Sequence, residues 1–345
     1  MLISDLDYEL PEELIAQHPL ERRDASRMMI LDRSRQNYRD GRFADFPALL
    51  NSDDVVVVNN TRVFPARLYG KRKPSGAHVE LFLIREFEEK VWEVLARPAR
   101  RLKIGSRIDF GNGRLSAEVI DAPDDGRRIV RFACETEFDL ILEEIGQTPL
   151  PPYIKRDKEP SEKDRERYQT VYASERGAIA APTAGLHFTP AVIDELKIRG
   201  VEIVEITLHV GYGTFQPVRV SDLAAHRVSS ESYAISDGAA LQLNEARAAR
   251  RRIIAIGTTT TRALESSIGE TGRVTPGSQV ADLTITPGYQ FGIVNALVTN
   301  FHLPKSSLLA LVAAFAGRDL ILSAYQRAVE LRYRFYSYGD CMLII

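Results

Sequence analysis

The chain has 345 residues, with 45 basic and 47 acidic side chains, a formal net charge of −2 and 44% hydrophobic residues. This composition is that of an ordinary soluble protein and excludes collagen-like, coiled-coil and largely disordered classes. A length prior of roughly 150 residues per domain predicts two domains.

Long apolar segments are absent from the sequence. The longest uninterrupted apolar run, residues 308–316, is well short of the ~20 residues that a membrane-spanning helix needs. Acidic residues arrive early in the chain, before any apolar core of a signal peptide. Cys134 and Cys341 form neither a disulfide framework nor a metal-spaced pair. We therefore expect a cytoplasmic protein with no membrane contact.

The first 130 residues change from a mixed pattern to short β runs. Residues 10–17 predict a short helix, with Pro11 in its first turn and Pro19 after its end. Seven β runs then follow between turn signals such as Gly111-Asn112-Gly113, and they predict a small barrel or sandwich. The runs are 55–58, 66–69, 78–84, 91–96, 108–110, 115–120 and 128–132.

The remainder of the chain alternates helices with apolar strands. Thr189 and Pro190 predict a helix start and Gly200 its end, and residues 201–208, 253–256 and 342–345 read as strands. Helices are expected near 238–250, 261–268 and 320–331. This alternation predicts an α/β fold, in which a mixed-sheet domain (1–64 with 135–345) is interrupted by an inserted β-barrel-like domain (65–134). The charged stretch 155–167 reads as a mobile loop.

Basic residues concentrate in one segment. Residues 62–107 carry a net charge of +7, so the rest of the chain carries −9. Such an excess on a strand-rich surface is typical of a phosphate-binding face. The alternative is a solvated basic edge that discourages strand-to-strand aggregation.

Polar islands rich in Gly, Thr, His and Asn interrupt the apolar sequence. They are 59–62, 181–189, 207–215, 257–262, 299–304 and 338–340. Several follow an apolar run, and ligands of α/β sheets gather where strands end. Each island alone also fits a turn, a helix cap or a buried histidine. Together they predict a common ligand site.

Glycines give two of these islands a specific interpretation. Gly185 permits close backbone approach to a ligand just before a helix start, where free amides bind anions. Gly211 and Gly213, with Tyr212 and Phe215, allow a flat base or a cationic sulfonium to lie against ring faces; a glycine-bent strand is the alternative. The run is no dinucleotide fingerprint, because Gln216 holds the third glycine position.

The islands, taken in order, resemble the S-adenosylmethionine:tRNA ribosyltransferase-isomerases of queuosine biosynthesis. The resemblance runs from Leu10 to the C-terminus and rests on residues 59–63, 149–154, 167–173, 181–189, 207–215, 257–259, 299–304 and 334–340. It implies transfer of the ribosyl portion of S-adenosylmethionine onto 7-aminomethyl-7-deazaguanine at the tRNA wobble position. Epoxyqueuosine-tRNA, adenine and methionine are the implied products. A barrel-like insertion, no metal and a monomer are also implied.

Two positions depart from the family pattern. Where the family often reads His-x-Met-His-x-Glu, this chain has His226-Arg227-Val228-Ser229-Ser230-Glu231, so that Ser229 replaces the second histidine. Asn295 stands where an aspartate is usual. An obligatory proton transfer at the first position, or a charge at the second, is therefore in doubt for this chain.

The implied chemistry needs a general base, because the sulfonium acidifies the proton on the adjacent ribose carbon. Histidine suits proton transfer near neutral pH, and the candidates are His187, His209 and His302. Glu231 or Asp340 is expected to orient a histidine or to pair with the substrate ammonium. The expected substrate-binding residues are Asn60, Arg62, Thr183, Gly185, Gly211, Gly213, Thr258, Thr259, Arg262 and Asn300, together with those two acids.

The partner implied by the resemblance is the anticodon arm of tRNA. Its expected backbone contacts are the basic residues Lys71, Arg72, Lys73, Arg100, Arg101 and Lys103, with the stretch 155–167. Two rival readings predict different products. A tRNA-binding module that has lost catalysis would release neither adenine nor methionine, and an ordinary methyltransferase would release S-adenosylhomocysteine. The latter normally has a glycine-rich first strand-turn-helix, which this sequence lacks.

Overall fold

The computed structural model describes residues 1–123, 125–156, 161–215, 218–269 and 271–345. The chain forms two compact units. The first unit holds Met1–Arg62, Pro151–Lys155 and Arg167–Ile345, and the second holds Val63–Leu150 and Arg156–Glu166. The second unit therefore extends beyond the stretch 65–134 expected for the insertion. Gln216, which argued against a dinucleotide fingerprint, lies outside the described residues, as does Pro217.

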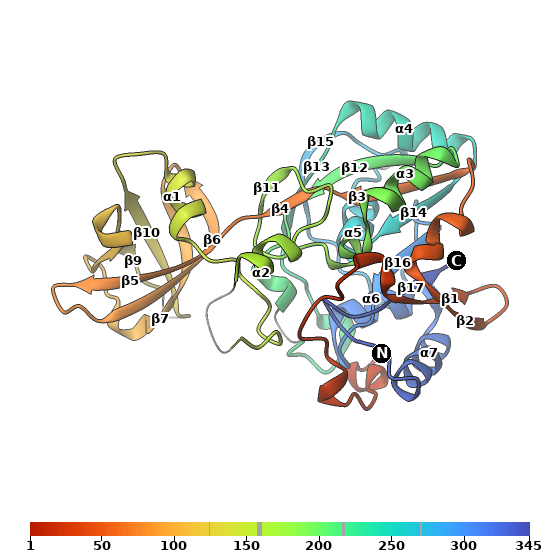
Figure 1. Cartoon of the computed structure of the whole chain (residues 1–345), viewed down its shortest axis with the longest axis horizontal. Helices are drawn as coiled ribbons and strands as arrows, with labels where there is room; N and C mark the ends of the chain where they lie inside the picture. Colours follow the sequence, from red (N-terminus) through yellow and green to blue (C-terminus); the bar gives the residue numbers. More distant parts are fainter. Residues whose placement is uncertain (124, 157–160, 216–217, 270) are drawn as a thin grey trace. The chain divides into compact units, whose positions relative to one another are not determined.

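A nine-stranded mixed sheet forms the centre of the first unit (Figure 1). Its strand order is β15-β13-β12-β3-β14-β16-β17-β1-β2. The strands are β1 (Arg27–Asp32), β2 (Asn37–Arg42), β3 (Asp54–Asn59), β12 (Glu202–Leu208), β13 (Glu231–Ile235), β14 (Arg252–Ile256), β15 (Gly277–Ala281), β16 (Ala296–Asn300) and β17 (Cys341–Ile344). A two-stranded sheet joins β4 (Thr61–Val63) and β11 (Glu175–Ala178).

The four-valine run explains why β3 lies in the middle of this sheet. Val56 pairs with Ile203 of β12 on one side and with Ile254 of β14 on the other, both in parallel. Every residue of β3 is buried. Strands covered on both faces read as continuous apolar runs, as this one does. The parallel strands β12, β3, β14 and β16 therefore place their carboxyl ends along one edge of the sheet.

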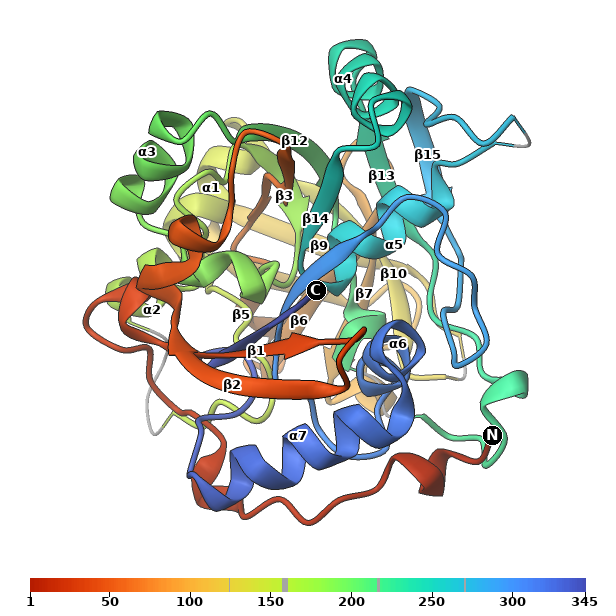
Figure 2. The same ribbon diagram turned by 90° about the vertical axis from the view of Figure 1, so that its right-hand side faces the viewer.

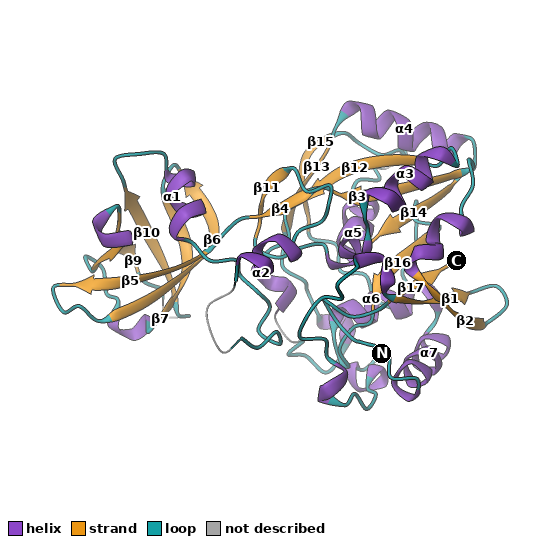
Figure 3. Ribbon diagram, viewed as in Figure 1, coloured by secondary structure: helices purple, strands orange, loops and turns teal. Residues whose placement is uncertain are grey.

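Helices pack on the sheet of this unit (Figure 3). They are α3 (Pro190–Ile198), α4 (Asp237–Ala248), α5 (Thr258–Ser266), α6 (Ser307–Ala316) and α7 (Arg318–Glu330). The predicted start of α3 is confirmed, because the Thr189 hydroxyl accepts a hydrogen bond from the Val192 amide at 3.2 Å. In the core beside the sheet, Phe43 stacks on Phe46, and Phe188 packs edge-on against both rings. Figure 2 shows α7 running beside β2. The hydroxyl oxygens of Tyr38 on β2 and Ser323 on α7 are 3.1 Å apart.

The second unit contains a closed six-stranded barrel of order β10-β7-β6-β5-β8-β9. Its strands are β5 (Arg67–Lys73), β6 (His78–Glu88), β7 (Val91–Arg97), β8 (Arg107–Phe110), β9 (Leu115–Asp121) and β10 (Arg127–Ala133), and its helices are α1 (Phe138–Ile145) and α2 (Glu162–Arg167). The predicted fold class, a mixed-sheet α/β body with a small barrel, is confirmed. Residues 55–58 were counted among the barrel runs wrongly, since they form β3 of the large sheet.

Two local predictions are wrong. Residues 10–17 contain only a short 3-10 turn, Glu12–Leu14, because the backbone here bonds to a distant segment. The Phe335 amide donates to Leu14, and the Ala16 amide donates to Phe335. The stretch 155–167 is no simple loop, since it contains α2 and the Arg156–Asp164 ion pair at 2.7 Å; residues 157–160 lie outside the described part.

The helix pair α6 and α7 contains the longest apolar run of the sequence. Among the described residues, no single helix has the length and apolar character to cross a membrane. The two helices pass such a test only when joined, and they bend by 117° at their junction. Most of α6 is buried in the core.

Candidate active site

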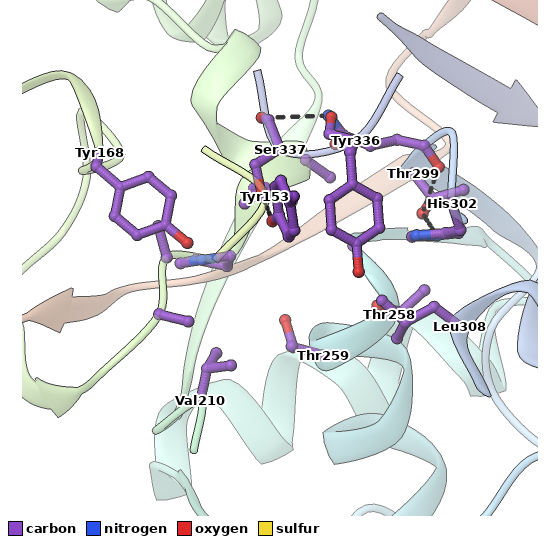
Figure 4. Close-up of a pocket in the computed structure, with 17 residues that line it drawn as sticks. Tyr153, Tyr168, Val210, Thr258, Thr259, Thr299, His302, Leu308, Tyr336 and Ser337 are labelled. Atoms are coloured by element: carbon purple, nitrogen blue, oxygen red, sulfur yellow. Dashed lines mark hydrogen bonds between the residues drawn. The ribbon is translucent and has the colours of Figure 1, made fainter. Parts of the chain in front are cut away.

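A cavity opens where β14 and β16 end, and we call it the main cavity. Its empty volume is about 560 Å³, including space open to solvent, which is within the range of small-molecule sites. Figure 4 shows its side chains. The lining residues are Tyr153, Tyr168, Ala180, Ala181, Pro182, Thr183, Ala184, Val210, Gly257, Thr258, Thr259, Thr299, Asn300, His302, Leu308, Tyr336 and Ser337.

The turn from β14 into α5 supplies hydroxyl groups to this cavity. Gly257 has a φ of +94°, a left-handed conformation that favours glycine, and its amide donates to Val298 of β16 at 2.8 Å. Thr258 and Thr259 line the cavity in the first turn of α5. No side chain caps α5, so the first-turn amides are available to a ligand.

The end of β16 supplies an amide and an imidazole. The Asn300 side-chain amide donates to the Tyr336 carbonyl at 3.0 Å, which ties β16 to the C-terminal segment. His302 Nε2 lies 2.8 Å from the Thr299 hydroxyl. Burial lowers the pKa of His302 to about 3, so this imidazole is neutral at pH 7.

Three tyrosines form the aromatic wall of the main cavity: Tyr153, Tyr168 and Tyr336. In Figure 4 the Tyr336 ring lies between Tyr153 on one side and the side chains of Thr258 and Leu308 on the other. The ring centroids of Tyr153 and Tyr336 are 3.9 Å apart, with an interplanar angle of 80°. Tyr336 also has a φ of +71°, a conformation that costs free energy in a bulky residue and clusters at functional sites.

His187 lies beside a second, smaller cavity. We call this the arginine cavity, and Ser337 lines both it and the main cavity. The Ser26 hydroxyl lies 2.9 Å from His187 Nδ1 and also bonds to the Arg23 carbonyl at 3.2 Å. Nε2 has no hydrogen-bond partner among the described residues. Burial lowers the pKa of His187 to about 4, against the opposing effect of a side-chain hydrogen bond with Asn300 that is looser than regular geometry, so the ring is neutral at pH 7.

The expectation that all three candidate histidines share one cavity is wrong. His209 lines neither the main cavity nor the arginine cavity. Its Nδ1 lies 2.8 Å from the Thr61 hydroxyl, and a Cβ at Gly177 would come within 2.6 Å of its ring. The absence of a side chain at Gly177 therefore lets His209 pack against β4 and β11, outside these two cavities.

The two acids expected to orient a histidine have other partners. Glu231 pairs with Arg262 of α5, and its other carboxylate oxygen accepts a hydrogen bond from the Gly211 amide at 2.8 Å. Asp340 accepts from the Arg27 amide at 2.9 Å and from the Arg334 amide at 2.8 Å. Because Asp340 is only 1% exposed and fully engaged, we assign it a structural part in holding β1 against the C-terminal segment.

Five of the expected residues line the main cavity, and they are Thr183, Thr258, Thr259, Asn300 and His302. Asn60 is instead bonded to Glu205 at 3.2 Å and to Thr207 at 2.7 Å. Arg62 is exposed on β4. Gly185 meets no ligand space either, since a Cβ there would overlap the Tyr172 hydroxyl. The lack of a side chain at position 185 therefore makes room for Tyr172 and does not serve the approach of a ligand to the backbone.

A third cavity contains three more of the expected residues, Gly213, Glu231 and Arg262, and we call it the ion-pair cavity; Gly211 lines none of the three. Gly213, Ser229, Glu231 and Arg262 line it, and Leu308 lines both it and the main cavity. A Cβ at Gly213 would overlap Ser229, so the serine fills the space beside the glycine. The ring of Tyr212, expected against a ligand, lines none of these three cavities, and the side chain of Phe215 lies outside the described part of the chain.

Asn295, the second departure from the family pattern, has a structural partner. Its side-chain oxygen accepts a hydrogen bond from the backbone amide of Ile253 at 2.8 Å, and its backbone amide donates to the Ile253 carbonyl at 2.9 Å. These bonds fix the start of β14 next to β16. An amide oxygen serves this purpose as well as a carboxylate oxygen, so no charge is needed there.

The sequence reasoning missed Tyr153, Tyr168, Tyr336 and Ser337 as individual site residues. All four fall within segments that carry the family resemblance, but isolated aromatic residues gave no sign of facing a ligand. Within the described residues, no group of three or more His, Cys, Asp or Glu is placed to hold a metal ion.

Hydroxyls, an amide, an imidazole and phenol rings gathered at the ends of parallel strands define an α/β enzyme site for a polar organic ligand with aromatic parts. The comparisons with known proteins specify the class. The family model described as queuosine biosynthesis protein matches residues 3–344. The chain therefore belongs to the queuosine biosynthesis protein family, as the sequence resemblance predicted.

Proteins named S-adenosylmethionine:tRNA ribosyltransferase-isomerase are similar over their whole length. The protein from Desulforamulus reducens is 50% identical over 345 residues, covering 100% of both chains. That from Syntrophotalea carbinolica is 51% identical over 347 residues, again covering 100% of both. The crystal structure of an S-adenosylmethionine tRNA ribosyltransferase from Thermotoga maritima aligns with a TM-score of 0.56 and 38% identity, covering 99% of this chain and 100% of that one.

Proposed function

We propose that this protein transfers the ribosyl moiety of S-adenosylmethionine onto 7-aminomethyl-7-deazaguanine at the wobble position of tRNA, giving epoxyqueuosine-tRNA, adenine and methionine. The observation that carries the proposal is the main cavity, where β14 and β16 end in a chain of this family. S-adenosylmethionine and tRNA are the two substrates that the names of the relatives imply. The family resemblance also favours a cytoplasmic monomer.

The lining of the main cavity supports binding of a nucleoside. Tyr153, Tyr168 and Tyr336 offer ring faces and edges to a purine or deazapurine base. Thr258, Thr259 and the uncapped amides of α5 offer donors and acceptors to ribose hydroxyls. Thr183 and Asn300 add a further hydroxyl and amide to the lining.

We assign the general base to His187. Its Nε2 has no hydrogen bond of regular geometry, its only hydrogen-bonding influence on the pKa comes from the Asn300 side chain, and the ring is neutral at pH 7, so we take Nε2 as the atom that accepts the proton. In the proposed sequence, His187 takes the proton from the ribose carbon beside the sulfonium. Adenine then leaves, the aminomethyl nitrogen attacks the opened ribose, and epoxide closure expels methionine.

His302 is assigned a positioning part in this scheme. It lines the main cavity, its Nε2 is engaged by the Thr299 hydroxyl, and burial lowers its pKa further than that of His187, to about 3 against about 4. His209 has no place in the scheme, because it lies outside the cavities described above.

The barrel unit supports the RNA part of the proposal. Lys71, Lys73, Arg100, Arg101 and Lys103 are exposed on it, and Arg72 is half-buried. The alternative reading, a basic edge that prevents aggregation, loses its basis because a closed barrel has no edge strands. We therefore assign these cations to the tRNA backbone. Since a wobble base is unpaired, its presentation to an enzyme costs little.

Product identity tests the function in one assay. The purified protein is incubated with S-adenosylmethionine and tRNA carrying 7-aminomethyl-7-deazaguanine, and the products are identified by mass spectrometry. Adenine and methionine in equal amounts, with the corresponding mass gain in the tRNA, are expected. S-adenosylhomocysteine would indicate a methyltransferase, and tRNA binding without turnover would indicate a binding module. Either result would overturn the proposal.

A further inference from the structure

The main cavity offers no formal charge to a ligand. None of its lining residues is Asp, Glu, Lys or Arg within the described part of the chain. S-adenosylmethionine, the substrate under the proposed function, carries a carboxylate at the end of its methionine portion. A carboxylate removed from water needs a cation or several hydrogen-bond donors. The uncapped amides of α5 offer donors but no formal charge, so a cation for this carboxylate has to come from a neighbouring space.

Two neighbouring cavities contain arginines, but the arginine of one cavity is already paired with a glutamate. In the ion-pair cavity, the Arg262 guanidinium pairs with Glu231. Three of its other donors bond to the carbonyls of Leu283, Ser229 and Ala281 at 3.2, 3.2 and 3.0 Å. Four of its five N–H donors are therefore engaged, and its charge is compensated by the Glu231 carboxylate.

The arginine cavity differs from the ion-pair cavity, because its described lining contains cationic side chains and no carboxylate. Arg23 and Arg167 line it, and no acidic residue is among its described lining. Arg167 is held in place by hydrogen bonds to the carbonyls of Leu20 at 2.7 Å and Glu21 at 3.3 Å, while its buried Nε has no hydrogen-bond partner among the described residues. A fixed guanidinium with a spare donor is well suited to bind a carboxylate.

The electrostatics at His187 agree with a positive potential in this cavity. After burial, which has the largest effect, the charges of Arg334 and Arg23 both act to lower the pKa of His187. His187 is only 4% exposed, and its unpartnered Nε2 marks a buried polar atom that awaits a ligand. The same space therefore combines two guanidinium groups with the group assigned as the base.

We infer that the arginine cavity binds the methionine carboxylate of S-adenosylmethionine through Arg23 and Arg167, while the nucleoside lies in the main cavity. The two cavities are adjacent, because Ser337 lines both, and the two ends of one substrate would be held on either side of this residue. This inference rests on the proposed function and names where one end of its substrate is held. It also explains the position of His187, because the sulfonium and its acidified ribose carbon lie between the two ends of the substrate.

The test compares S-adenosylmethionine with decarboxylated S-adenosylmethionine, which lacks only the carboxylate. Equilibrium dialysis without tRNA gives the Kd of each compound for the wild type and for Arg23→Gln and Arg167→Gln. A hydrogen bond to a charged group corresponds to roughly 10- to 100-fold in affinity. The wild type is expected to prefer the carboxylated compound by about that factor, and each variant is expected to lose most of this preference. Arg199→Gln, at an exposed helix position, is the control that keeps it.

Three results would overturn the inference. The preference could persist in both arginine variants, which would place the carboxylate elsewhere, for example at the first turn of α5. The wild type could show no preference between the two compounds. The variants could instead raise only the KM for tRNA and its salt dependence, which would assign the cavity to an RNA phosphate. Adenine release by the wild type, measured separately, reports the proposed function itself and distinguishes its failure from that of the subsite.

Discussion

The Ser26 hydroxyl and the His187 ring form a directed hydrogen-bond pair. Ser26 Oγ lies 2.9 Å from His187 Nδ1 and 3.2 Å from the Arg23 carbonyl oxygen, which can only accept a hydrogen bond. The single hydroxyl hydrogen is therefore used on Arg23, and the hydroxyl oxygen accepts from Nδ1–H. We assign the neutral ring the Nδ1–H tautomer on this network, which leaves the lone pair on Nε2.

Replacement of His187 tests this assignment. Because loss of a general base costs typically 10²- to 10⁴-fold, His187→Asn is expected to lower the kcat for adenine release by roughly that factor. Ser26→Ala removes only the group that fixes the tautomer, and we expect a loss of about 5- to 10-fold. The measurement is adenine release under single turnover with saturating substrates.

His78→Asn, at an exposed position of the barrel, is the matched control and is expected to retain the wild-type rate. A near-normal rate in His187→Asn would reject base catalysis by this residue. If Ser26→Ala slowed the reaction as much as His187→Asn, Ser26 would have a part beyond orienting the ring.

Gly185 provides a test of packing rather than chemistry. A Cβ there would overlap the Tyr172 hydroxyl and approach Thr170 Cγ2 at 2.8 Å, so Gly185→Ala is expected to lower the free energy of unfolding by about 1–3 kcal/mol. The Tyr172 hydroxyl is buried without a hydrogen-bond partner among the described residues, so Tyr172→Phe alone is expected to be neutral or stabilising.

The Gly185→Ala/Tyr172→Phe double variant should recover part of the lost stability, because the phenylalanine lacks the oxygen that the new Cβ would meet. Urea unfolding of the four proteins gives the coupling between the two positions. Strict additivity would show that the hydroxyl is not what excludes a side chain at position 185.

Periodicity and caps in the sequence predicted much of the first unit. Four consecutive valines indicated a strand buried on both faces, and β3 occupies the middle of the sheet. The limits of α3 were predicted from its cap residues, since Thr189, Pro190 and Gly200 affect only the helix ends next to them. The helix predicted over residues 10–17 does not form, because the backbone of this segment makes hydrogen bonds with Phe335, which is distant in the sequence and which no local signal reveals.

The site was harder to predict than the fold. Strand-end polarity correctly pointed to Thr258 and Asn300, because parallel strands end along one edge. The positions of His187, His209 and Gly185 depend on which side chains pack beside them, and these neighbours are distant in sequence. Tyr336 is marked by its φ of +71°, a property of the backbone that composition and spacing do not reveal.

The buried pair of Glu231 and Arg262 predicts an asymmetric stability effect. Arg262→Met leaves the Glu231 carboxylate, which is 5% exposed, without its main cation, and we expect a loss of about 3–5 kcal/mol in unfolding free energy. The Glu231→Gln/Arg262→Met double variant is expected to lose less than the sum of the two single changes. Urea unfolding measures each value.

The exposed ion pair of Glu195 and Arg199 on α3 serves as the comparison. Their N–O distance is 2.7 Å, but 37% of the Arg199 side chain and 45% of the Glu195 side chain are exposed. Glu195→Gln should therefore change the stability by no more than about 0.5 kcal/mol. Equal effects at the two pairs would contradict the importance assigned to burial of Glu231.

Charge reversal on the barrel tests the proposed RNA surface. The Arg100→Glu/Arg101→Glu variant removes two exposed cations, so tRNA affinity should fall and the slope of log K against log salt should become less steep by about 2. The Kd is measured by filter binding between low and moderate salt. The same reversal at Arg318 and Arg327, two exposed arginines of α7, is the control for net charge. An unchanged slope in the barrel variant would remove this surface from the RNA interface.

The last prediction concerns stability at acid pH. Burial lowers the pKa of His302 to about 3, compared with about 6.5 in an unfolded chain. Above pH 6.5 the ring is neutral in both states, so the full stability is present. As the pH falls from 6.5 towards 3, only the unfolded state takes up the proton, and stability is lost. Between pH 7.5 and 4.5 this single group should cost about 2–3 kcal/mol.

His302→Asn removes the titrating group, so its unfolding free energy should fall less over this pH interval than that of the wild type. Urea unfolding at several pH values measures the difference, and His18→Asn, at an exposed position, is the matched control. Parallel curves for His302→Asn and the wild type would mean that His302 becomes charged in the folded protein. That outcome would return this residue to the candidates for proton transfer, because a ring that titrates near neutral pH inside the main cavity can exchange a proton with adenine.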